Sequence, residues 1–415
     1  RLFAASPFLT EILLRRPAEL EHLTEHQRLA EIKLPPQLLS EAEAAAGAGS
    51  TPEALDNLRR FQQREILRLA ACDTFHLLDL QTVTQQLAWL AESLVQCCLT
   101  VAARDLQQDA SEFAVLAFGK LGGIELNYSS DIDLVFICRK SAERYASLGQ
   151  RLIRALSETT REGFLYRVDM RLRPWGKSGP LVTTAEAYLD YLRRQGRPWE
   201  KQALLKARGI AGAPHLADEF LAETQPLVFG GDLNEARQNI LRMKGEIERH
   251  AGRVGPVEAD VKAGPGGIRE IEFLTQYLQL VNGRARPRVR KTGTLAALVE
   301  LADADLILPG EYQRLTSAYV FLRTVEHAIQ LRHNLQGHSL PAHPRELADL
   351  ARRLDYPSAD HFLRQRLEHQ RCVREIFDRW MRPQPPTRTP DEVTTPPAQA
   401  QVGEAAPGDE GVSGA

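Results

Sequence analysis

The sequence has few cysteines, and none of them are spaced to bind zinc. The 415 residues include five cysteines, an odd number, with no C-x-x-C pair. This leaves no framework for a disulfide-stabilised fold or a cysteine zinc site, and it favours a reducing compartment. The adjacent residues Cys97 and Cys98 lie in an apolar stretch, so we expect them to be small core residues.

The sequence also lacks a long apolar run and an excess of one charge. No segment approaches the roughly 18 apolar residues that span a membrane, and no signal peptide opens the chain. Lysine and arginine number 52 against 54 acidic residues, which gives a net charge of -2. General nucleic-acid binders carry a basic excess. We therefore expect no nucleic-acid partner, no membrane association and a cytoplasmic location.

The length and patterning predict an α+β fold with several parts. Hydrophobic residues make up 43% of the chain, enough for two or three domains with sizeable cores. Residues 1–110 predict an N-terminal helical segment, and residues 111–235 predict an α/β or α+β domain built on a mixed sheet flanked by helices. Residues 236–382 predict a helical bundle. Residues 383–415, rich in Pro, Thr, Ala and Gly, predict a disordered tail or linker.

Hydrophobic periodicity predicts individual elements within these parts. Short apolar runs predict strands at Ala114–Phe118, Ile132–Cys138 and Phe164–Leu172, with a further short strand at Ala259–Lys262. Helical stripes predict helices at Asp73–Arg104, Leu148–Glu158, Ala185–Arg194, Ile271–Leu280, Leu295–Leu301 and Tyr319–Leu331. Thr183 and Glu186 form a capping box at the start of the third of these helices.

Two aspartates lie at the start of the second predicted strand. Side chains two residues apart on a strand point to the same face, so Asp131 and Asp133 can share one site. Two carboxylates this close repel each other unless a cation lies between them, and hard oxygen ligands suit Mg²⁺ or Mn²⁺. The alternative is a solvated pair at a strand end. The apolar neighbours Ile132 and Leu134 favour a central strand and a functional pair.

A glycine-rich turn precedes the two aspartates. Gly119 ends the first strand, and Gly122 and Gly123 follow within a few residues. Glycines let backbone N–H groups approach phosphate oxygens without a side chain in the way. The turn is not a Walker A loop, because G-x-x-x-x-G-K-[ST] is absent. Lys120, inside the turn, is expected to be solvated.

A third carboxylate, Asp169, lies in the segment FLYRVDMRLRP. Polar and apolar residues alternate there, which places Arg167, Asp169, Arg171 and Arg173 on one face of the predicted strand. If this strand pairs beside Asp131, Asp169 joins a two-metal site, where it activates the attacking oxygen or holds the second metal. Arg171 and Arg173 would then offer forked donors to phosphate. An exposed charged strand face is the alternative.

A second glycine-rich turn follows Lys262. Gly264, Gly266 and Gly267 precede a predicted helix, whose N-terminal N–H groups and dipole attract anions. The turn is therefore a candidate site for inorganic phosphate or a nucleotide phosphate, with Lys262 beside it. An ordinary tight turn is the equal alternative. Glu270 and Glu272 point to different sides of the helix, so we expect at most one of them at the site.

Longer strings in the chain resemble a known family. The glycine turn followed by Ser-Asp-Ile-Asp resembles the signature of the nucleotidyltransferase superfamily shared with DNA polymerase β. From about Leu69 to Met381 the chain resembles the glutamine synthetase adenylyltransferase/adenylyl-removing family. The strings that carry this resemblance are GKLGGIELNYSSDIDL, YRVDMRLRPWGKSGPL, WEKQALLKAR and GPGGIREIEFLTQYLQL.

The resemblance implies a fold and a set of site residues. It implies a DNA polymerase β-like mixed sheet, bound Mg²⁺, and ATP, ADP and inorganic phosphate as substrates or products. It implies metal binding at Asp131 and Asp133 and a catalytic role for Asp169. Gly119, Gly122 and Ser130 fall in the family's nucleotide-phosphate turn.

The resemblance also implies an activity on a protein. In that family, an N-terminal catalytic half removes AMP from a tyrosine of glutamine synthetase by phosphorolysis and releases ADP. A C-terminal half attaches AMP from ATP to the same tyrosine. This chain has one copy of the motifs, and ELNYSSDIDL and GGIREIEF resemble the N-terminal copy. A PII-type signal protein is the implied regulator.

Other functions remain open from the sequence. The chain could instead adenylylate glutamine synthetase with ATP, or dock on glutamine synthetase without catalysis. A nucleotidyltransferase that acts on a nucleic acid or a small molecule is a further alternative.

Overall fold

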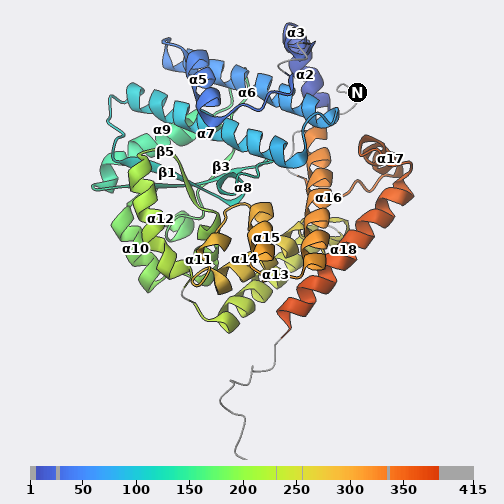
Figure 1. Cartoon of the computed structure of the whole chain (residues 1–415). Coiled ribbons are helices and arrows are strands. Elements are labelled where there is room, and N and C mark those ends of the chain that lie inside the picture. The colour runs from blue at the N-terminus through green and yellow to red at the C-terminus, as the bar shows by residue number, and fades with distance from the viewer. Residues whose placement is uncertain (1–5, 25–28, 230, 255, 334–336, 383–415) are drawn as a thin grey trace, which may run out of the picture. The chain divides into compact units, whose positions relative to one another are not determined.

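A five-stranded mixed sheet separates two groups of helices (Figure 1). The computed structural model describes residues 6–24, 29–229, 231–254, 256–333 and 337–382. The chain up to Met381 forms one compact unit. The predicted tail at 383–415 lies outside the described residues.

The sheet has the strand order β3-β2-β1-β5, and β4 also pairs with β2. Its strands are β1 (Phe113–Phe118), β2 (Ile132–Cys138), β3 (Val168–Asp169), β4 (Val182–Thr184) and β5 (Arg208–Gly212). β1 is antiparallel to β2 and β5, whereas β3 and β4 are parallel to β2. The predicted α+β class with a mixed sheet is confirmed.

The central strands β1 and β2 are apolar because helices cover both faces of the sheet. Phe113, Val115 and Ala117 belong to one core cluster, and the intervening residues Ala114 and Leu116 to another. This alternation follows from the two-residue period of a strand. Every residue of β1 is buried, and so is every residue of β2 except Asp133. A continuous apolar run is typical of a strand buried on both faces.

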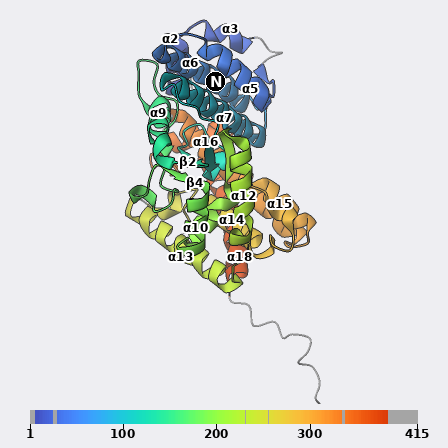
Figure 2. The same ribbon diagram turned by 90° about the vertical axis from the view of Figure 1, so that its left-hand side faces the viewer.

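Helices of the N-terminal segment lie on the first face of the sheet, as Figures 1 and 2 both show. They are α2 (Pro7–Arg15), α3 (Glu19–Thr24), α5 (Pro35–Ala46), α6 (Thr51–Thr74) and α7 (Leu80–Asp105). α7 is long and apolar enough for a membrane span, but 72% of its most apolar window is buried inside the fold. A buried core helix passes the same test of length and composition.

The single helix predicted for Asp73–Arg104 is wrong at its start. α6 ends at Thr74 and α7 begins at Leu80, after a turn in which His76 has a φ of 55°. Asp79 caps the new helix, since its side chain accepts a hydrogen bond from the N–H of Thr82. A capping aspartate thus interrupts an apolar stripe that otherwise continues through the turn.

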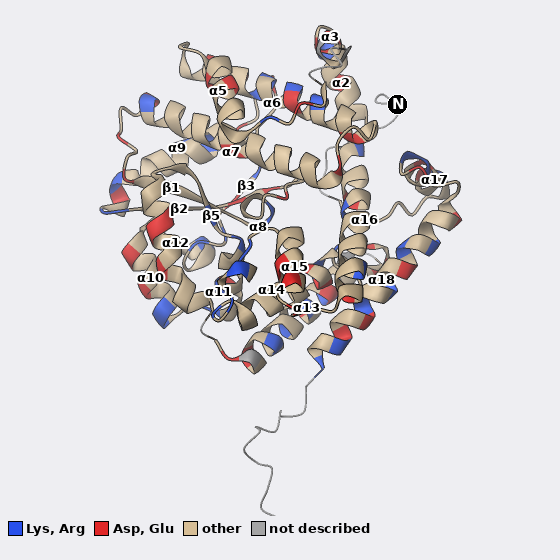
Figure 3. Ribbon diagram, in the orientation of Figure 1, with Lys and Arg blue, Asp and Glu red and all other residues tan. Residues whose placement is uncertain are grey.

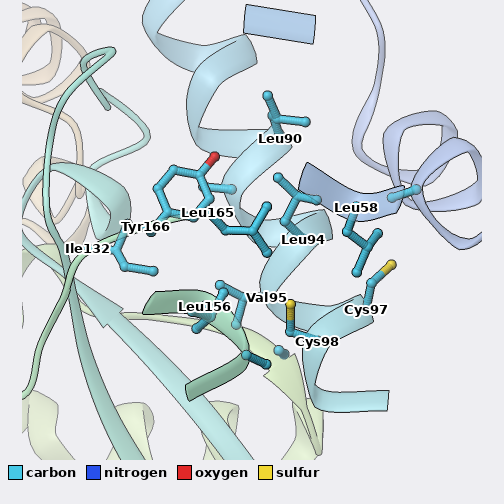
Figure 4. Close-up of a cluster of buried hydrophobic side chains, with 14 of the residues drawn as sticks. Leu58, Leu90, Leu94, Val95, Cys97, Cys98, Ile132, Leu156, Leu165 and Tyr166 are labelled. Atoms are coloured by element: carbon cyan, nitrogen blue, oxygen red, sulfur yellow. The ribbon is translucent and has the colours of Figure 1, made fainter. Parts of the chain in front are cut away.

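The core on this face joins α7 to the start of β2 (Figure 4). Leu90 and Leu94 of α7 are fully buried in the same cluster as Ile132. Cys97 and Cys98 are buried free thiols, which confirms their predicted core role. Ile132 separates the two aspartates in the sequence, so its packing on the α7 side directs Asp131 and Asp133 to the opposite face.

Two helices cover the second face of the sheet. α10 (Ala185–Arg194) and α12 (Pro214–Val228) contribute Tyr188, Leu192 and Phe220 to its core. The predicted helix 185–194 is confirmed, although Thr184 rather than Thr183 is its N-cap. Helix α9 (Ala146–Ser157) packs with α7 on the first face. The later helices are α11 (Pro198–Ala203), α13 (Leu233–Val254), α14 (Ile268–Asn282), α15 (Thr294–Asp303), α16 (Pro309–His333), α17 (Pro344–Arg353) and α18 (Ala359–Met381).

The strand predicted at Ala259–Lys262 is reduced to a single bridge. A 3-10 turn covers Val257–Ala259, and Asp260 pairs with Ser339 in an isolated antiparallel bridge. The N–H of Val261 donates to the carbonyl of His338 at 2.8 Å. This bridge holds Lys262 next to His338, across about 75 residues of sequence.

Candidate active site

Three aspartates meet where β2 and β3 begin. Asp133 of β2 pairs in register with Asp169 of β3, and Asp131 lies two residues before Asp133. All three line a cavity of about 370 Å³. We call them the carboxylate wall. Acidic and basic segments meet in this part of the molecule, beside β3 and the short helix α8 (Gly119–Gly122) (Figure 3).

The cavity lies between the sheet and the later helices. From the sheet side it is lined by Gly119, Ser130, Asp131, Asp133, Asp169 and Arg171. From the helical side it is lined by Lys262, Arg269, Glu272, Gln276, Gln330 and His338. Of the positions predicted from the sequence, Gly122, Gly123 and Arg173 do not line it.

Asp133 has the most perturbed carboxylate of the wall. Burial raises its pKa to about 6, and the nearby charges of Asp169 and Asp131 add to this rise. Lys262 and Arg171 act in the opposite direction. Among the described residues, the Asp133 carboxylate has no hydrogen bond and no ion pair. The three acidic groups are therefore close enough to repel one another, as a shared cation site requires.

The carboxylates of Asp131 and Asp169 each form an ion pair with an arginine. Arg167 donates from Nε to Asp131 Oδ1 at 2.6 Å. Arg171 donates from its backbone N–H to Asp169 Oδ1 at 2.8 Å and from Nε to Oδ2 at 2.7 Å. Burial alone would raise the pKa of Asp169, but the hydrogen bonds from Arg171 hold it below the usual value. Both arginines act as internal counter-ions for the carboxylate wall.

The three carboxylates are suitable ligands for a divalent metal, although their oxygens do not converge on one point in this structure. Within the residues that the structure describes, no three His, Cys, Asp or Glu side chains form a ready metal site. Asp131 and Asp169 turn toward their arginines instead. Three carboxylates, one of them unpaired with a raised pKa, are nevertheless the hard oxygen ligands that Mg²⁺ or Mn²⁺ takes.

Gly119 is required by close packing on Asp133. Its φ is +56°, and a Cβ at this position would lie 2.3 Å from Asp133 Oδ2. Gly122 is required for a different reason, since its Cβ would lie 1.8 Å from the carbonyl oxygen of Lys206. Of the predicted phosphate-turn glycines, only Gly119 therefore faces the cavity. Ser130 lies at the cavity as well.

The strand predicted for Phe164–Leu172 is much shorter in the structure. Only Val168 and Asp169 are extended, because the chain turns directly after Met170. Arg173 lies in that turn and donates to the backbone carbonyls of Met170, Lys177 and Gly179. The guanidinium predicted to meet phosphate thus stabilises a turn, whereas Arg171 remains at the cavity.

The glycine turn after Lys262 does not offer free N–H groups at the start of α14. The N–H groups of Gly267, Ile268 and Arg269 donate to carbonyls of Gly264, Val261 and Lys262 at 2.9 to 3.0 Å. The prediction of exposed backbone donors is wrong for these three positions. The side chain of Lys262 does line the cavity.

Only one of the two glutamates on α14 reaches the cavity, as predicted. Glu272 lines it. Glu270 instead pairs with Arg374 at 2.7 Å and with Lys244 at 3.1 Å.

A cluster of buried charges lies behind the cavity, and the sequence did not reveal it. We call it the buried network: Lys120, Glu125, Asn127, Arg323 and Glu326. Lys120 Nζ donates to both carboxylate oxygens of Glu326 at 2.9 Å, so the prediction that Lys120 is solvated is wrong. Asn127 donates to Glu326 at 2.7 Å, and Arg323 donates to the carbonyl of Glu125 at 2.7 Å.

The buried network joins the loop before the carboxylate wall to helix α16. Glu326 is 0% exposed and Arg323 is 1% exposed. Burial alone would raise the pKa of Glu326, but Lys120 and the neighbouring cations hold it well below its usual range. Lys206 pairs with Glu125 in the same region and borders the cavity. These contacts fix the loop that precedes Asp131.

The mixed sheet flanked by helices is consistent with a nucleotidyltransferase-like α+β fold. Residues 1–223 match the glutamate-ammonia ligase adenylyltransferase family, and the chain belongs to this family. Residues 234–381 match the family described as GlnD PII-uridylyltransferase. The carboxylate wall lies in the first matched region, and Lys262, Arg269 and His338 lie in the second.

A curated relative supports the same assignment. The bifunctional glutamine synthetase adenylyltransferase/adenylyl-removing enzyme of Hahella chejuensis (strain KCTC 2396) is 36% identical over 401 residues. The alignment covers 91% of this chain but only 42% of that relative. The chain therefore spans less than half the length of the relative.

Proposed function

We propose that this chain removes AMP from the adenylylated tyrosine of glutamine synthetase by phosphorolysis and releases ADP. It would do so as one part of a bifunctional adenylyltransferase/adenylyl-removing enzyme. The observation that carries the proposal is the carboxylate wall, with Asp133 and Asp169 in register across two parallel strands. The name of the relative supports both directions of the reaction, and the ELNYSSDIDL and GGIREIEF motifs favour removal.

The residues of the cavity have distinct tasks in this proposal. Asp131, Asp133 and Asp169 would hold Mg²⁺, or Mn²⁺, which supplies neutralisation of phosphate charge when bound. Gly119 leaves room for Asp133 at the end of β1. Arg171 pairs with Asp169 at the cavity, and its guanidinium would donate to a phosphate oxygen if Asp169 held a cation. Gly122 and Gly123 shape the turn, and Ser130 borders the phosphates.

The reaction exchanges the phosphodiester bond to tyrosine for the phosphoanhydride bond of ADP. An orthophosphate oxygen attacks the α-phosphorus of the AMP–tyrosine ester. A new P–O bond to the phosphate forms, and the P–O bond to the tyrosine oxygen breaks. The proton of the attacking phosphate is transferred to the tyrosine oxygen. The products are ADP and the unmodified tyrosine side chain of glutamine synthetase. Positioning and charge stabilisation supply most of the rate in such transfers.

The proposal assigns a role to each part of the chain and names two protein partners. Residues 111–235 form the catalytic domain, and the helical residues 236–382 close the cavity from the other side. Glutamine synthetase is the protein substrate. The match of residues 234–381 to a PII-uridylyltransferase family supports a PII-type signal protein as regulator. The buried thiols and the nucleotide chemistry are consistent with a cytoplasmic location.

The test is to mix the chain with adenylylated glutamine synthetase, Mg²⁺ and orthophosphate. We expect one ADP for each AMP removed. Asp133→Asn should lower kcat at least about a hundredfold, as expected for the loss of a charge-stabilising group. Asp190→Asn, at a half-exposed ion pair with Arg194 on α10, is the matched control and should keep full activity.

The reverse direction gives a different result in the same assay. AMP transfer from ATP to unmodified glutamine synthetase, without ADP release from the adenylylated form, would assign the chain to adenylylation. Binding to glutamine synthetase with neither reaction would leave only a docking role.

A further inference from the structure

Three basic or amide side chains face the carboxylate wall from the opposite side of the cavity. Lys262 precedes α14, Arg269 is in its first turn, and Gln330 lies on α16. Their position across from the aspartates makes the cavity bipolar, with metal-binding chemistry on one side and anion-binding chemistry on the other.

Arg269 is a cation without an acidic partner. In the part of the chain that the structure describes, its guanidinium makes no hydrogen bond and no ion pair, although it is only half exposed and lines the cavity. Its backbone N–H donates to the carbonyl of Lys262 at 3.0 Å, which ties the two residues together across the glycine turn, and both side chains line the cavity. A guanidinium has five N–H donors in a fork that matches phosphate oxygens.

Lys262 is also poorly neutralised. Its nearest carboxylate is Glu326, at 3.9 Å, and Glu326 already accepts three shorter hydrogen bonds from Lys120 and Asn127. Lys262 acts electrostatically on Asp133 across the cavity. The ammonium therefore lies within reach of any group bound at the carboxylate wall.

Gln330 provides an independent sign of a ligand. It is 2% exposed, it lines the cavity, and its Oε1 has no hydrogen-bond partner among the described residues. A buried polar atom without a partner is costly, and such atoms in native proteins are usually satisfied by a ligand or an ion. The amide can turn to present its NH₂ group to an anion.

We propose that Arg269, Lys262 and Gln330 form a subsite for one phosphate group, which takes the attacking orthophosphate of the phosphorolysis reaction. This inference rests on the proposed function for the identity of the nucleophile. The chemistry demands that the same subsite binds the β-phosphate of the product ADP, because that phosphate is the former orthophosphate. AMP, which lacks a β-phosphate, occupies the cavity without touching the subsite.

Binding of three probes tests the subsite without any turnover. Titration calorimetry of the chain with ADP, AMP and orthophosphate, each with Mg²⁺, gives the affinities directly. For Arg269→Gln and for Lys262→Gln, we expect ADP and orthophosphate to bind about 10- to 100-fold more weakly, as for loss of a charge-assisted hydrogen bond, with AMP unchanged. Arg269→Lys should recover part of the loss.

Arg284→Gln is the matched control, since it removes the same charge at an exposed position just after α14. It should leave all three affinities unchanged. A thermal unfolding curve for each variant shows that it is folded. Equal weakening of ADP and AMP, or no weakening of either, overturns the subsite.

Two further measurements complete the test. The first distinguishes orthophosphate from a nucleotide phosphate as the ligand of the subsite, and the second distinguishes failure of the subsite from failure of the proposed function. If the wild-type chain binds ATP and ADP but not orthophosphate, the subsite serves a nucleotide tail and the orthophosphate assignment is overturned. If ADP binding depends on Arg269 as expected but no ADP is released from adenylylated glutamine synthetase, the subsite stands and the proposed function fails.

Discussion

The carboxylate wall and the buried network both contain partly or fully buried carboxylates, but those of the network have cationic partners and Asp133 of the wall has none in the ranges that the structure describes. In the buried network, Glu326 accepts hydrogen bonds from Lys120 and Asn127, and Arg323 lies 3.3 Å from it. In the carboxylate wall, Asp133 has no partner among the described residues, and its pKa is raised to about 6, chiefly by burial. The fold thus neutralises the charges of the buried network, whereas it leaves the Asp133 carboxylate of the carboxylate wall without a counter-ion in the described part of the chain.

The difference shows which charges stabilise the fold and which are available to a ligand. A buried charge that loses its partner is strongly destabilising, so the buried network must remain intact. A buried carboxylate that has no partner and lies beside like charges lowers stability, and such groups are characteristic of functional sites. Substitutions in the two regions should therefore change stability in opposite directions.

The largest effect is expected from Glu326→Ala. The change leaves Lys120 and Arg323 buried without their common carboxylate, which typically costs about 3–5 kcal/mol of unfolding free energy. Urea denaturation measures this directly. Glu346→Gln, at a half-exposed ion pair with Arg332, should cost less than about 1 kcal/mol. A loss for Glu326→Ala no larger than that of the control would contradict the assigned role of the network.

Asp133→Asn should act in the opposite direction and stabilise the metal-free protein. The pKa of Asp133 is raised from its ordinary value to about 6, so the folded state binds a proton that the unfolded state releases near pH 4. Wild-type stability is therefore favoured below about pH 4 and is lost as the pH rises through about 6. At pH 7 the variant should be more stable by about 3 kcal/mol, because the pKa rises from 3.8 to about 6 and each pKa unit corresponds to about 1.4 kcal/mol.

Denaturation of both proteins in EDTA from pH 4 to pH 8 checks this prediction. The difference in unfolding free energy should grow between pH 4 and pH 6 and then level off. A difference that is constant across the whole range would show that Asp133 does not carry unneutralised charge. The same variant should lose activity, as stated above, which separates stability from function at one position.

Gly119→Ala should have a moderate cost in stability and a large cost in activity. The alanine must adopt a φ of +56°, which costs about 1–2 kcal/mol, and its Cβ displaces the Asp133 carboxylate. Gly47→Ala is the matched control, because Gly47 has a φ of +63° with no atom within 4 Å of an added Cβ. Both variants should lose similar stability, but only Gly119→Ala should lose activity. Equal activity of the two would remove Gly119 from the site.

The elements that the sequence predicted well are those set by local pattern. β2 matches its predicted range, since a strand buried on both faces is a continuous apolar run. The sequence predicted a shared site only on the condition that the Asp169 segment pairs beside β2, and the structure pairs Asp133 with Asp169 in register. The turn after Met170 was missed, because alternating polarity continues through residues that no longer extend.

The partners of the charged groups were hidden from the sequence. Lys120 and Glu326 are separated by 206 positions, and no local signal indicates that they form a buried pair. The same holds for Gln330 and Arg269, which meet at the cavity from different helices. Long-range neutralisation depends on tertiary packing, so it decides which of many charged residues remain free for a ligand.

Arg167→Gln should give the smallest change in stability and the sharpest view of the carboxylate wall. The Arg167–Asp131 pair has side chains that are 40% and 34% exposed, so its loss should cost less than about 1 kcal/mol. However, Arg167 occupies an oxygen of Asp131 that a cation would need. Calorimetric titration with Mn²⁺ should therefore show tighter binding to Arg167→Gln than to the wild type. If the variant binds Mn²⁺ more weakly, Arg167 orients Asp131 for the metal instead of competing with it.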